Sequence, residues 1–409
     1  MWHRIFEKSK AAVVSIEVDV RIPLFSEDSG TFYGTGLVID PKQGLIVVSQ
    51  QVAKPGKLAS AKAKFFNQQT VDIKLLHMDP WHDFSVFQYD PRLIHISIPR
   101  LQFEAPSNLS EQQAILGISH SWEQGLIQRE GKINKPFVVR AENKLGRYSQ
   151  SIDTGQAFES LLIGSPIFTK KGRVLGFHSK GSDTSSIAIS AQYVEAMLKV
   201  LPGSPPPRGD IQWSLDIENV FDAEQFYKLS SRYVPRDTYG SPAHPFVLKV
   251  TRTVQGSEAQ KKLLPGDLLL YAREEKGEWR RIGQDIYGLD HWIDGQIGKT
   301  IEFKISRLGK QKTVRLNVRD AYQNMPDRFM TFAGSTFHAI TPTLSMIYHV
   351  DPDAGMYIAD TLHGTSFGSS SQYGTLLMRF DAKSLQQLRI LGQDIFAFSK
   401  PKSCNCTIH

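Results

Sequence analysis

Cysteine is almost absent from this sequence: its 409 residues contain two, Cys404 and Cys406, both within the last six positions. A disulfide framework is therefore excluded, which fits a reducing compartment. No run approaches the ~18 apolar residues of a membrane helix. The first residues, MWHRIFEKSK, also lack the uninterrupted apolar stretch of a secretory signal. We therefore expect an intracellular protein, cytoplasmic or nuclear, without a membrane span.

Dense blocks of basic residues are lacking too. The net charge is +7, with 48 Lys and Arg against 41 Asp and Glu spread along the chain. Such a distribution indicates a solvated surface, not a nucleic-acid site. The tail CNCTIH resembles a metal-binding cluster or a prenylation box, but it has no second ligand pair and ends in a poor final residue, His409. We expect no metal, no cofactor and no nucleic-acid partner.

Short runs rich in Val and Ile fill the first half of the chain, separated by Gly and Pro. This pattern predicts an all-β barrel or sandwich pair, closed by a helix at AQYVEAMLKVL. PGSPPPRGD then indicates a linker. Two further segments share a strand, turn, short helix and strand, and we interpret them as a diverged repeat, the second one incomplete. We expect a barrel domain over 1–201, a Pro-rich linker over 202–208, modules over 209–320 and 326–400, and a disordered tail over 401–409.

Three stretches carry a family resemblance: FYGTGLVIDPKQGLIVVSQQVA, DPWHDFSVFQYD and SPIFTKKGRVLGFHS. In this order they resemble the HtrA/DegP family, whose members have a trypsin-like double β-barrel followed by PDZ domains. The whole chain is most similar to the degenerate second protease domain, with its PDZ-like domains, of the tandem HtrA-like proteins of fungi and plants. The resemblance implies a mainly β, multidomain fold: a trypsin-like double β-barrel followed by two PDZ-like α+β modules.

The same resemblance places the catalytic positions of the family on Gln51, Asp83 and Ile163. Glutamine has no titrating nitrogen near neutral pH, so it cannot act as the general base. Isoleucine cannot attack a carbonyl, and Leu161 replaces a glycine that helps to shape the oxyanion hole. Leu161, Leu162 and Ile163 are expected to pack into the emptied cleft, and Asp83 to cap the strand that follows it.

A displaced triad is the alternative. A slip of one or two residues would make Ser165 or Ser160 the nucleophile, with a relocated histidine as its base. The candidates are His77, His82, His120 and His178, but we expect all four to be ordinary surface or loop imidazoles. We expect His82 and Asp83 to lie on an extended segment and to point to opposite faces, which disfavours a dyad between them.

In the first PDZ-like module, WSLDIENV resembles the strand that binds peptides by strand addition, because HtrA-type modules are circularly permuted. The candidate residues on its edge are Ser214, Leu215, Asp216 and Ile217. No glycine lies in this stretch, and Asp216 would repel a carboxylate, so docking of an internal or intramolecular segment competes with capture of a chain terminus. A module that is only a structural spacer is the third possibility. In the next module AGSTFHAIT occupies the corresponding place.

The expected function is that of a catalytically inactive HtrA-like pseudoprotease that binds protein or peptide segments, or assembles, through its PDZ-like modules. Its partners could include a second copy of itself or an active protease. The alternative is a serine endopeptidase with the displaced triad.

Overall fold

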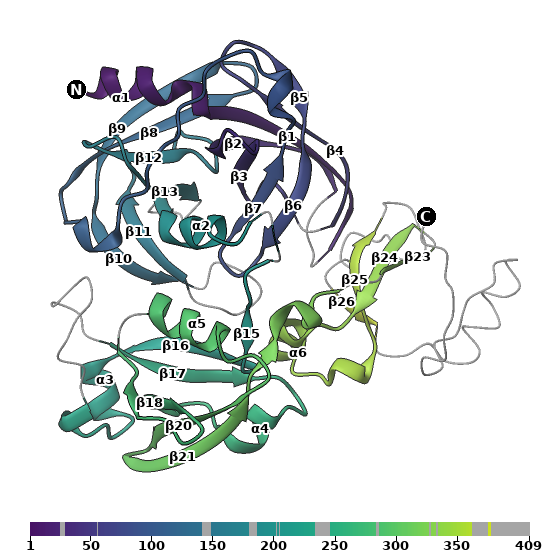
Figure 1. Cartoon of the computed structure of the whole chain (residues 1–409). Coiled ribbons are helices and arrows are strands. Elements are labelled where there is room, and N and C mark those ends of the chain that lie inside the picture. Colours follow the sequence, from purple (N-terminus) through teal and green to yellow (C-terminus); the bar gives the residue numbers. More distant parts are fainter. Residues whose placement is uncertain are drawn as a thin grey trace, which may run out of the picture.

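The computed structural model describes residues 1–377 with gaps at 25–28, 55, 141–148, 180–185, 202, 204, 234–245, 284–285, 327–328, 333 and 362–374 (Figure 1). The expected tail, with Cys404, Cys406 and His409, lies outside the described residues. So does the last part of the expected second module.

The N-terminal half contains two seven-stranded antiparallel sheets. The first has the order β5-β4-β1-β2-β3-β7-β6. Its strands are β1 (Val13–Pro23), β2 (Gly30–Asp40), β3 (Leu45–Ser49), β4 (Gly56–Lys64), β5 (Thr70–Asp72), β6 (Lys74–Asp79) and β7 (Phe84–Gln88). An amphipathic helix, α1 (Trp2–Ser9), precedes them and buries Ile5.

The second sheet has the order β10-β11-β14-β13-β12-β8-β9. Its strands are β8 (Ala114–Ser121), β9 (Gly125–Lys132), β10 (Lys135–Arg140), β11 (Ser149–Gly155), β12 (Pro166–Thr169), β13 (Val174–Ser179) and β14 (Ser186–Ser190). Helix α2 (Ala191–Leu198) follows and buries Val194 and Met197 against the barrel core, as its apolar spacing predicts. The core between the strands consists mainly of Val, Ile, Leu, Phe and Ala side chains with little exposed surface.

A second unit follows, built on the sheet β16-β17-β18-β20-β21 with β19 beside β18. Its strands are β16 (Trp213–Asn219), β17 (Phe246–Thr253), β18 (Leu268–Glu274), β19 (Arg280–Arg281), β20 (Thr300–Arg307) and β21 (Lys310–Asn317), and its helices are α3 (Val220–Gln225), α4 (Glu258–Lys262) and α5 (Ile286–Asp294). The β20–β21 loop is Leu308 and Gly309, both with positive φ, the two-residue hairpin turn that LGKQ predicts.

A small third unit contains the sheet β23-β24-β25-β26. Its elements are β23 (Phe329–Phe332), β24 (Ser335–Ala339), α6 (Pro342–Tyr348), β25 (Met356–Thr361) and β26 (Thr375–Leu377). The bridge β15 (Gly209–Asp210) with β22 (Arg319–Asp320) ties the start of the second unit to its end. Short 3-10 helices are η1 (Lys10–Ala12), η2 (Pro91–Leu93), η3 (Pro106–Asn108), η4 (Ser231–Tyr233), η5 (Ala321–Asn324) and η6 (Pro352–Ala354).

The barrel lies above the second unit in Figure 1, with α5 on the side that faces it. Arg208, which follows the proline run, is buried there and bonds to Asp79 of β6 and Asp294 of α5. The expected linker thus ends in a buried ion cluster that joins both units.

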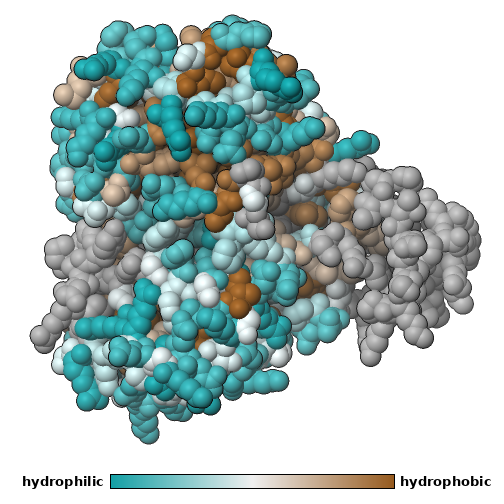
Figure 2. Space-filling view, viewed as in Figure 1, coloured by the Kyte–Doolittle hydropathy of each residue, from teal (hydrophilic) through white to brown (hydrophobic). Residues whose placement is uncertain are grey.

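On the face seen in Figure 2, apolar surface gathers over β6 and β7 of the barrel, whereas the second unit is mostly hydrophilic. Leu75 and Leu76 of β6 are 38% and 37% exposed.

No helix in the described part of the chain is long and apolar enough to cross a membrane.

Candidate functional site

Antiparallel pairing of β3 with β7 brings Gln51 and Asp83 together. Ser49, the last residue of β3, lies opposite Phe84, the first residue of β7. The turn after β3 and the turn before β7 therefore meet at one edge of the first sheet. The Gln50 N–H donates to the Asp83 carbonyl over 3.2 Å, which holds these turns in register.

Three polar side chains form a triangle at this edge. Gln51 Nε2 lies 3.3 Å from Asp83 Oδ2 and 2.7 Å from Ser179 Oγ, and the Ser179 hydroxyl donates to Asp83 Oδ2 over 3.2 Å. Ser179 ends β13, so the triangle bridges the two sheets. The amide donates to the carboxylate, as an imidazole N–H would, but it has no nitrogen that can take a proton near neutral pH.

Asp83 lies in a turn, not on an extended segment. Its φ is 55°, and residues 80–83 form the turn between β6 and β7. The expected extended segment at His82 and Asp83 is therefore wrong, because both residues lie in this turn. His82 nevertheless directs Nδ1 to the Asp79 carboxylate, 3.0 Å away, and its ring stacks on Tyr193.

Ile163 lies in a tight turn that is fixed to β2. Its carbonyl accepts from the Thr35 N–H over 2.9 Å. The next residue, Gly164, has a φ of 85°, and a Cβ there would lie 2.1 Å from the Thr35 carbonyl oxygen. Only glycine fits that close approach.

The backbone N–H groups of this turn are turned inward. The Leu161 N–H donates to the Phe158 carbonyl over 2.9 Å, and the Leu162 N–H donates to Ser119 Oγ over 3.2 Å. Leu161 is buried in a cluster with Phe158, Ile163 packs against the main barrel core, and Leu162 is half-buried. An oxyanion hole needs free donors aimed at one point, and the Leu161 donor is used within the turn.

Neither alternative serine meets an imidazole in the described part of the chain. Ser165 is buried, and its hydroxyl donates to the Leu162 carbonyl over 2.6 Å. Ser160 is exposed and makes no side-chain hydrogen bond to the described residues.

Each of the four candidate histidines is buried, so the expectation of surface imidazoles is wrong. His77 Nε2 lies 3.3 Å from the Tyr322 hydroxyl, and His120 Nδ1 lies 3.1 Å from the Val13 carbonyl. His178 is the neighbour of Ser165 across β12 and β13, but its Nδ1 has no hydrogen-bond partner among the described residues. Burial lowers the pKa of His178 to about 4. Burial also lowers the pKa of His77 and of His120, so these three imidazoles favour the neutral form.

The candidate peptide-binding residues, Ser214 to Ile217, lie in the middle of β16. This strand is at the edge of its sheet and pairs only with β17 among the described strands. Ser214, Leu215 and Asp216 are half-buried and Ile217 is 36% exposed. An edge strand of this kind can accept an added strand.

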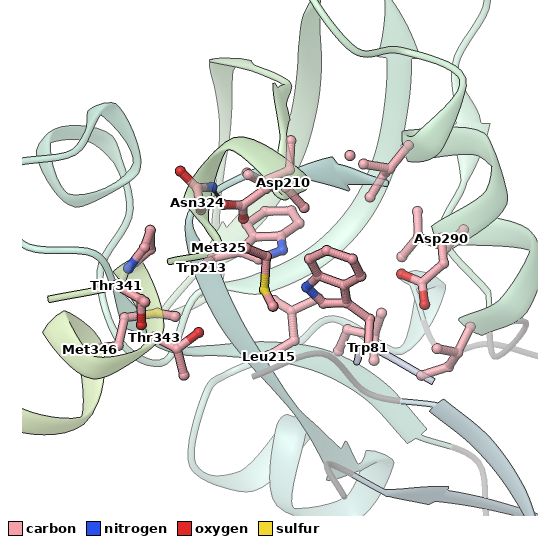
Figure 3. A pocket seen from close by; sticks show the side chains of 18 residues that line it. Trp81, Asp210, Trp213, Leu215, Asp290, Asn324, Met325, Thr341, Thr343 and Met346 are labelled. Carbon is pink, nitrogen blue, oxygen red and sulfur yellow. Dashed lines mark hydrogen bonds between the residues drawn. The ribbon is translucent and has the colours of Figure 1, made fainter. Parts of the chain in front are cut away.

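A cavity of about 80 Å³ lies where β16 faces α5 (Figure 3). Trp213 and Leu215 of β16 and Leu289 and Ile293 of α5 form its apolar walls. The other units close it: Trp81 comes from the barrel, Met325 follows η5, and Thr343 and Met346 come from α6. Figure 3 shows the side chains of Met325, Trp213 and Trp81 converging there.

The ion cluster beside this cavity is buried on all sides. Arg208 Nη2 lies 2.5 Å from Asp79 Oδ2, and Arg208 Nη1 lies 3.0 Å from Asp294 Oδ2. Burial alone would raise the pKa of Asp79, but the charge of Arg208, with His82, outweighs it and holds that pKa well below its usual range. A charge buried this completely depends on its partner.

No group of three or more His, Cys, Asp or Glu side chains in the described residues is placed to hold a metal ion. Sequence reasoning missed Ser179, Arg208 and Asp210. The strand GRVLGFHS, which ends in Ser179, was a signal for the first, because the strand after the nucleophile borders the cleft of this fold. The other two lie in a stretch that reads as a linker.

The paired seven-stranded sheets, with a polar triangle between them and an appended α+β unit, define a trypsin-like β fold of the HtrA type. HtrA-type protease AlgW, solved with a tripeptide, superposes with a TM-score of 0.56 at 15% identity, over 78% of this chain and 97% of that one. The serine endoprotease from Yersinia pestis gives 0.51 at 14% identity, over 78% and 98%. These structures confirm the predicted mainly β, multidomain, trypsin-like fold.

Sequence comparison finds relatives among the Do-like/HtrA serine proteases. Protease Do-like 7 of Arabidopsis thaliana is 26% identical over 361 residues, 83% of this chain and 32% of the relative. The pro-apoptotic serine protease nma111 of Aspergillus terreus is 25% identical over 371 residues, 88% of this chain and 34% of the relative. The chain spans about a third of the length of these relatives, and no protein-family model matches it. The chain is a homologue of the Do-like/HtrA serine proteases, as its motifs predict.

Proposed function

We propose that this chain is a catalytically inactive member of its family that binds extended segments of other proteins through the unit that carries β16 and α5. The observation that carries the proposal is the Gln51–Asp83–Ser179 triangle, in which an amide takes the place of a base. Ile163 occupies the position of the nucleophile.

Two further contacts support the loss of catalysis. The Leu161 N–H is used by the Phe158 carbonyl, so the oxyanion donor is spent within the turn. The Ser165 hydroxyl is used by the Leu162 carbonyl, so the displaced triad gains no support from its geometry.

Binding is supported by the position of β16 at the edge of its sheet among the described strands, and by the apolar cavity next to it. Strand addition would supply backbone hydrogen bonds along β16, and the cavity would supply selectivity for one side chain. We further propose a barrel domain over 1–201, a linker over 202–208 and two PDZ-like modules over 209–320 and 326–400. We also propose that the partner is a second copy of this chain or an active protease.

Peptide arrays test the binding function. We expect the full chain to retain a subset of peptides, and Leu215→Glu, which places a charge at the groove, to abolish retention. Leu93→Glu is the matched control, since Leu93 is 52% exposed on the barrel. Retention that Leu215→Glu leaves unchanged would place binding elsewhere.

A further inference from the structure

The loop before β16 already holds two carboxylates of this chain. The Gly209 N–H donates to Asp294 Oδ1 over 2.8 Å, and the Gln212 N–H donates to Asp210 Oδ1 over 2.7 Å. In strand-adding modules, the backbone donors of such a loop are the groups that hold the terminal carboxylate of a peptide. Here two of these donors are used by side chains of the chain itself.

Asp210 is fixed in this position from several directions. Its Oδ2 accepts from Asn324 Nδ2 over 2.7 Å, and its backbone pairs with Arg319 in the β15–β22 bridge. Gln212 has a φ of 61°, a left-handed conformation that is rare for a residue with a side chain. The loop is therefore built around the Asp210 carboxylate.

The charge of the cavity also disfavours a terminal carboxylate. Among the described residues that line it, the charged side chains are Asp210 and Asp290, and none is basic. A third carboxylate brought next to these two would be repelled. The remaining walls are largely apolar, and the volume of about 80 Å³ suits one aliphatic side chain.

We propose that the groove between β16 and α5 takes an internal extended segment of a partner protein and not a chain terminus. One aliphatic side chain of that segment fills the cavity. This inference rests on the proposed peptide-binding function and specifies its ligand.

Residues outside the unit that carries β16 and α5 limit the size of the side chain that can fill the cavity, which we call the anchor. Trp81 of the barrel and Met346 of α6 both line the cavity, so its far wall belongs to the neighbouring units. Shortening Met346 enlarges the cavity without touching β16 or the loop.

The first test uses arrays that display each peptide twice, once with a free terminal carboxylate and once with the terminus amidated. We expect the full chain to bind both forms within about threefold of each other, and to favour peptides that carry an aliphatic anchor residue. Asp210→Ala frees the Gln212 donor, so this variant should gain about tenfold for the free-carboxylate form. Asp72→Asn, on the exposed edge strand β5, should change nothing.

Preference of the unaltered chain for free carboxylates by about tenfold or more would overturn the inference and leave the proposed function standing. Binding of neither form would contradict the proposed function, and the inference with it. If Asp210→Ala does not fold, as judged by circular dichroism, the comparison of the two peptide forms on the unaltered chain decides alone.

The second test is Met346→Ala. We expect the preferred anchor to shift from aliphatic to aromatic side chains by about tenfold, since the cavity gains volume. Ile347→Ala, in the same helix but 42% exposed and away from the cavity, is the control. An unchanged anchor preference in Met346→Ala would contradict the placement of the anchor.

Discussion

Gln51 Nε2 donates to Asp83 Oδ2 over 3.3 Å, and it does so from the end of β3, directly opposite the start of β7. The carboxylate thus keeps a side-chain partner where hydrolysis would need an imidazole. Because Ser179 joins the same pair, the three side chains at the proposed former reaction centre form a hydrogen-bond triangle. This triangle stabilises the junction of the two sheets.

Gln51→His would place an imidazole on Asp83 but would supply no nucleophile. We therefore expect no hydrolysis of a fluorogenic casein by this variant, because Ile163 supplies no hydroxyl at the expected nucleophile position and the nearby Ser179 hydroxyl already donates to Asp83 Oδ2. The thermal midpoint serves as a control for folding. Turnover that appears in Gln51→His and vanishes in Gln51→His with Ser165→Ala would contradict this expectation.

Arg208→Met would leave Asp79 and Asp294 buried without their cation. We expect the free energy of unfolding to fall by about 3–5 kcal/mol, as for other buried pairs that lose one partner. Urea denaturation measures this loss. Arg92→Met is the control, because the Arg92–Asp90 pair is exposed and such pairs contribute about 0–1 kcal/mol. Equal losses in the two variants would show that burial of Arg208 does not matter.

Gly164→Ala and Gly155→Ala separate backbone strain from steric clash. Both glycines have positive φ, 85° and 60°. A Cβ at Gly155 meets nothing closer than 4.0 Å, so we expect a loss of about 1–2 kcal/mol from strain. A Cβ at Gly164 would lie 2.1 Å from the Thr35 carbonyl, so its loss should be clearly larger, because the turn must separate from β2. Chemical denaturation compares the two, and equal losses would mean that the turn is not held against β2.

Buried histidines predict how stability depends on pH. Burial lowers the pKa of His178 to about 4, and also lowers the pKa of His77 and His120. In the unfolded chain a histidine titrates near about 6.5, so between these values the unfolded state binds more protons. Stability should therefore fall as the pH drops from about 6.5 to about 4, by up to about 3 kcal/mol from His178.

Urea midpoints measured across this pH range test the direction, and His178→Gln should flatten part of the slope. The depressed pKa of Asp79 acts lower on the scale, since its stabilisation is present above about pH 4 and lost only below it. Constant or rising stability towards pH 4 would contradict the burial of these imidazoles in neutral form.

The sequence predicts the strands well because their periodicity is local. IEFKIS and TVRLNV alternate, and the Leu308–Gly309 turn between them needs positive φ, so the hairpin follows from neighbouring residues alone. The likeness to known motifs supplies the order of the sheets. By contrast, PGSPPPRGD reads as an exposed linker, yet Arg208 within it is buried. That burial depends on Asp79 and Asp294, which are distant in the sequence.

The sequence likewise predicts some contacts of the candidate site and not others. The motif register brings Gln51 to Asp83, but the contact with Ser179 arises only when the two sheets pack together. The edge position of β16 follows from its place in the module. The cavity beside it does not, because Trp81 and Met346 reach it from other units.

Labelling with a fluorophosphonate probe, which reacts with activated serines, tests the central claim most directly. We expect the full chain to remain unlabelled under conditions that label an active trypsin-like protease. The Ser165 hydroxyl donates to the Leu162 carbonyl, and no imidazole among the described residues is hydrogen-bonded to Ser160. Labelling that disappears in Ser165→Ala or in Ser160→Ala would show an activated serine and contradict the account.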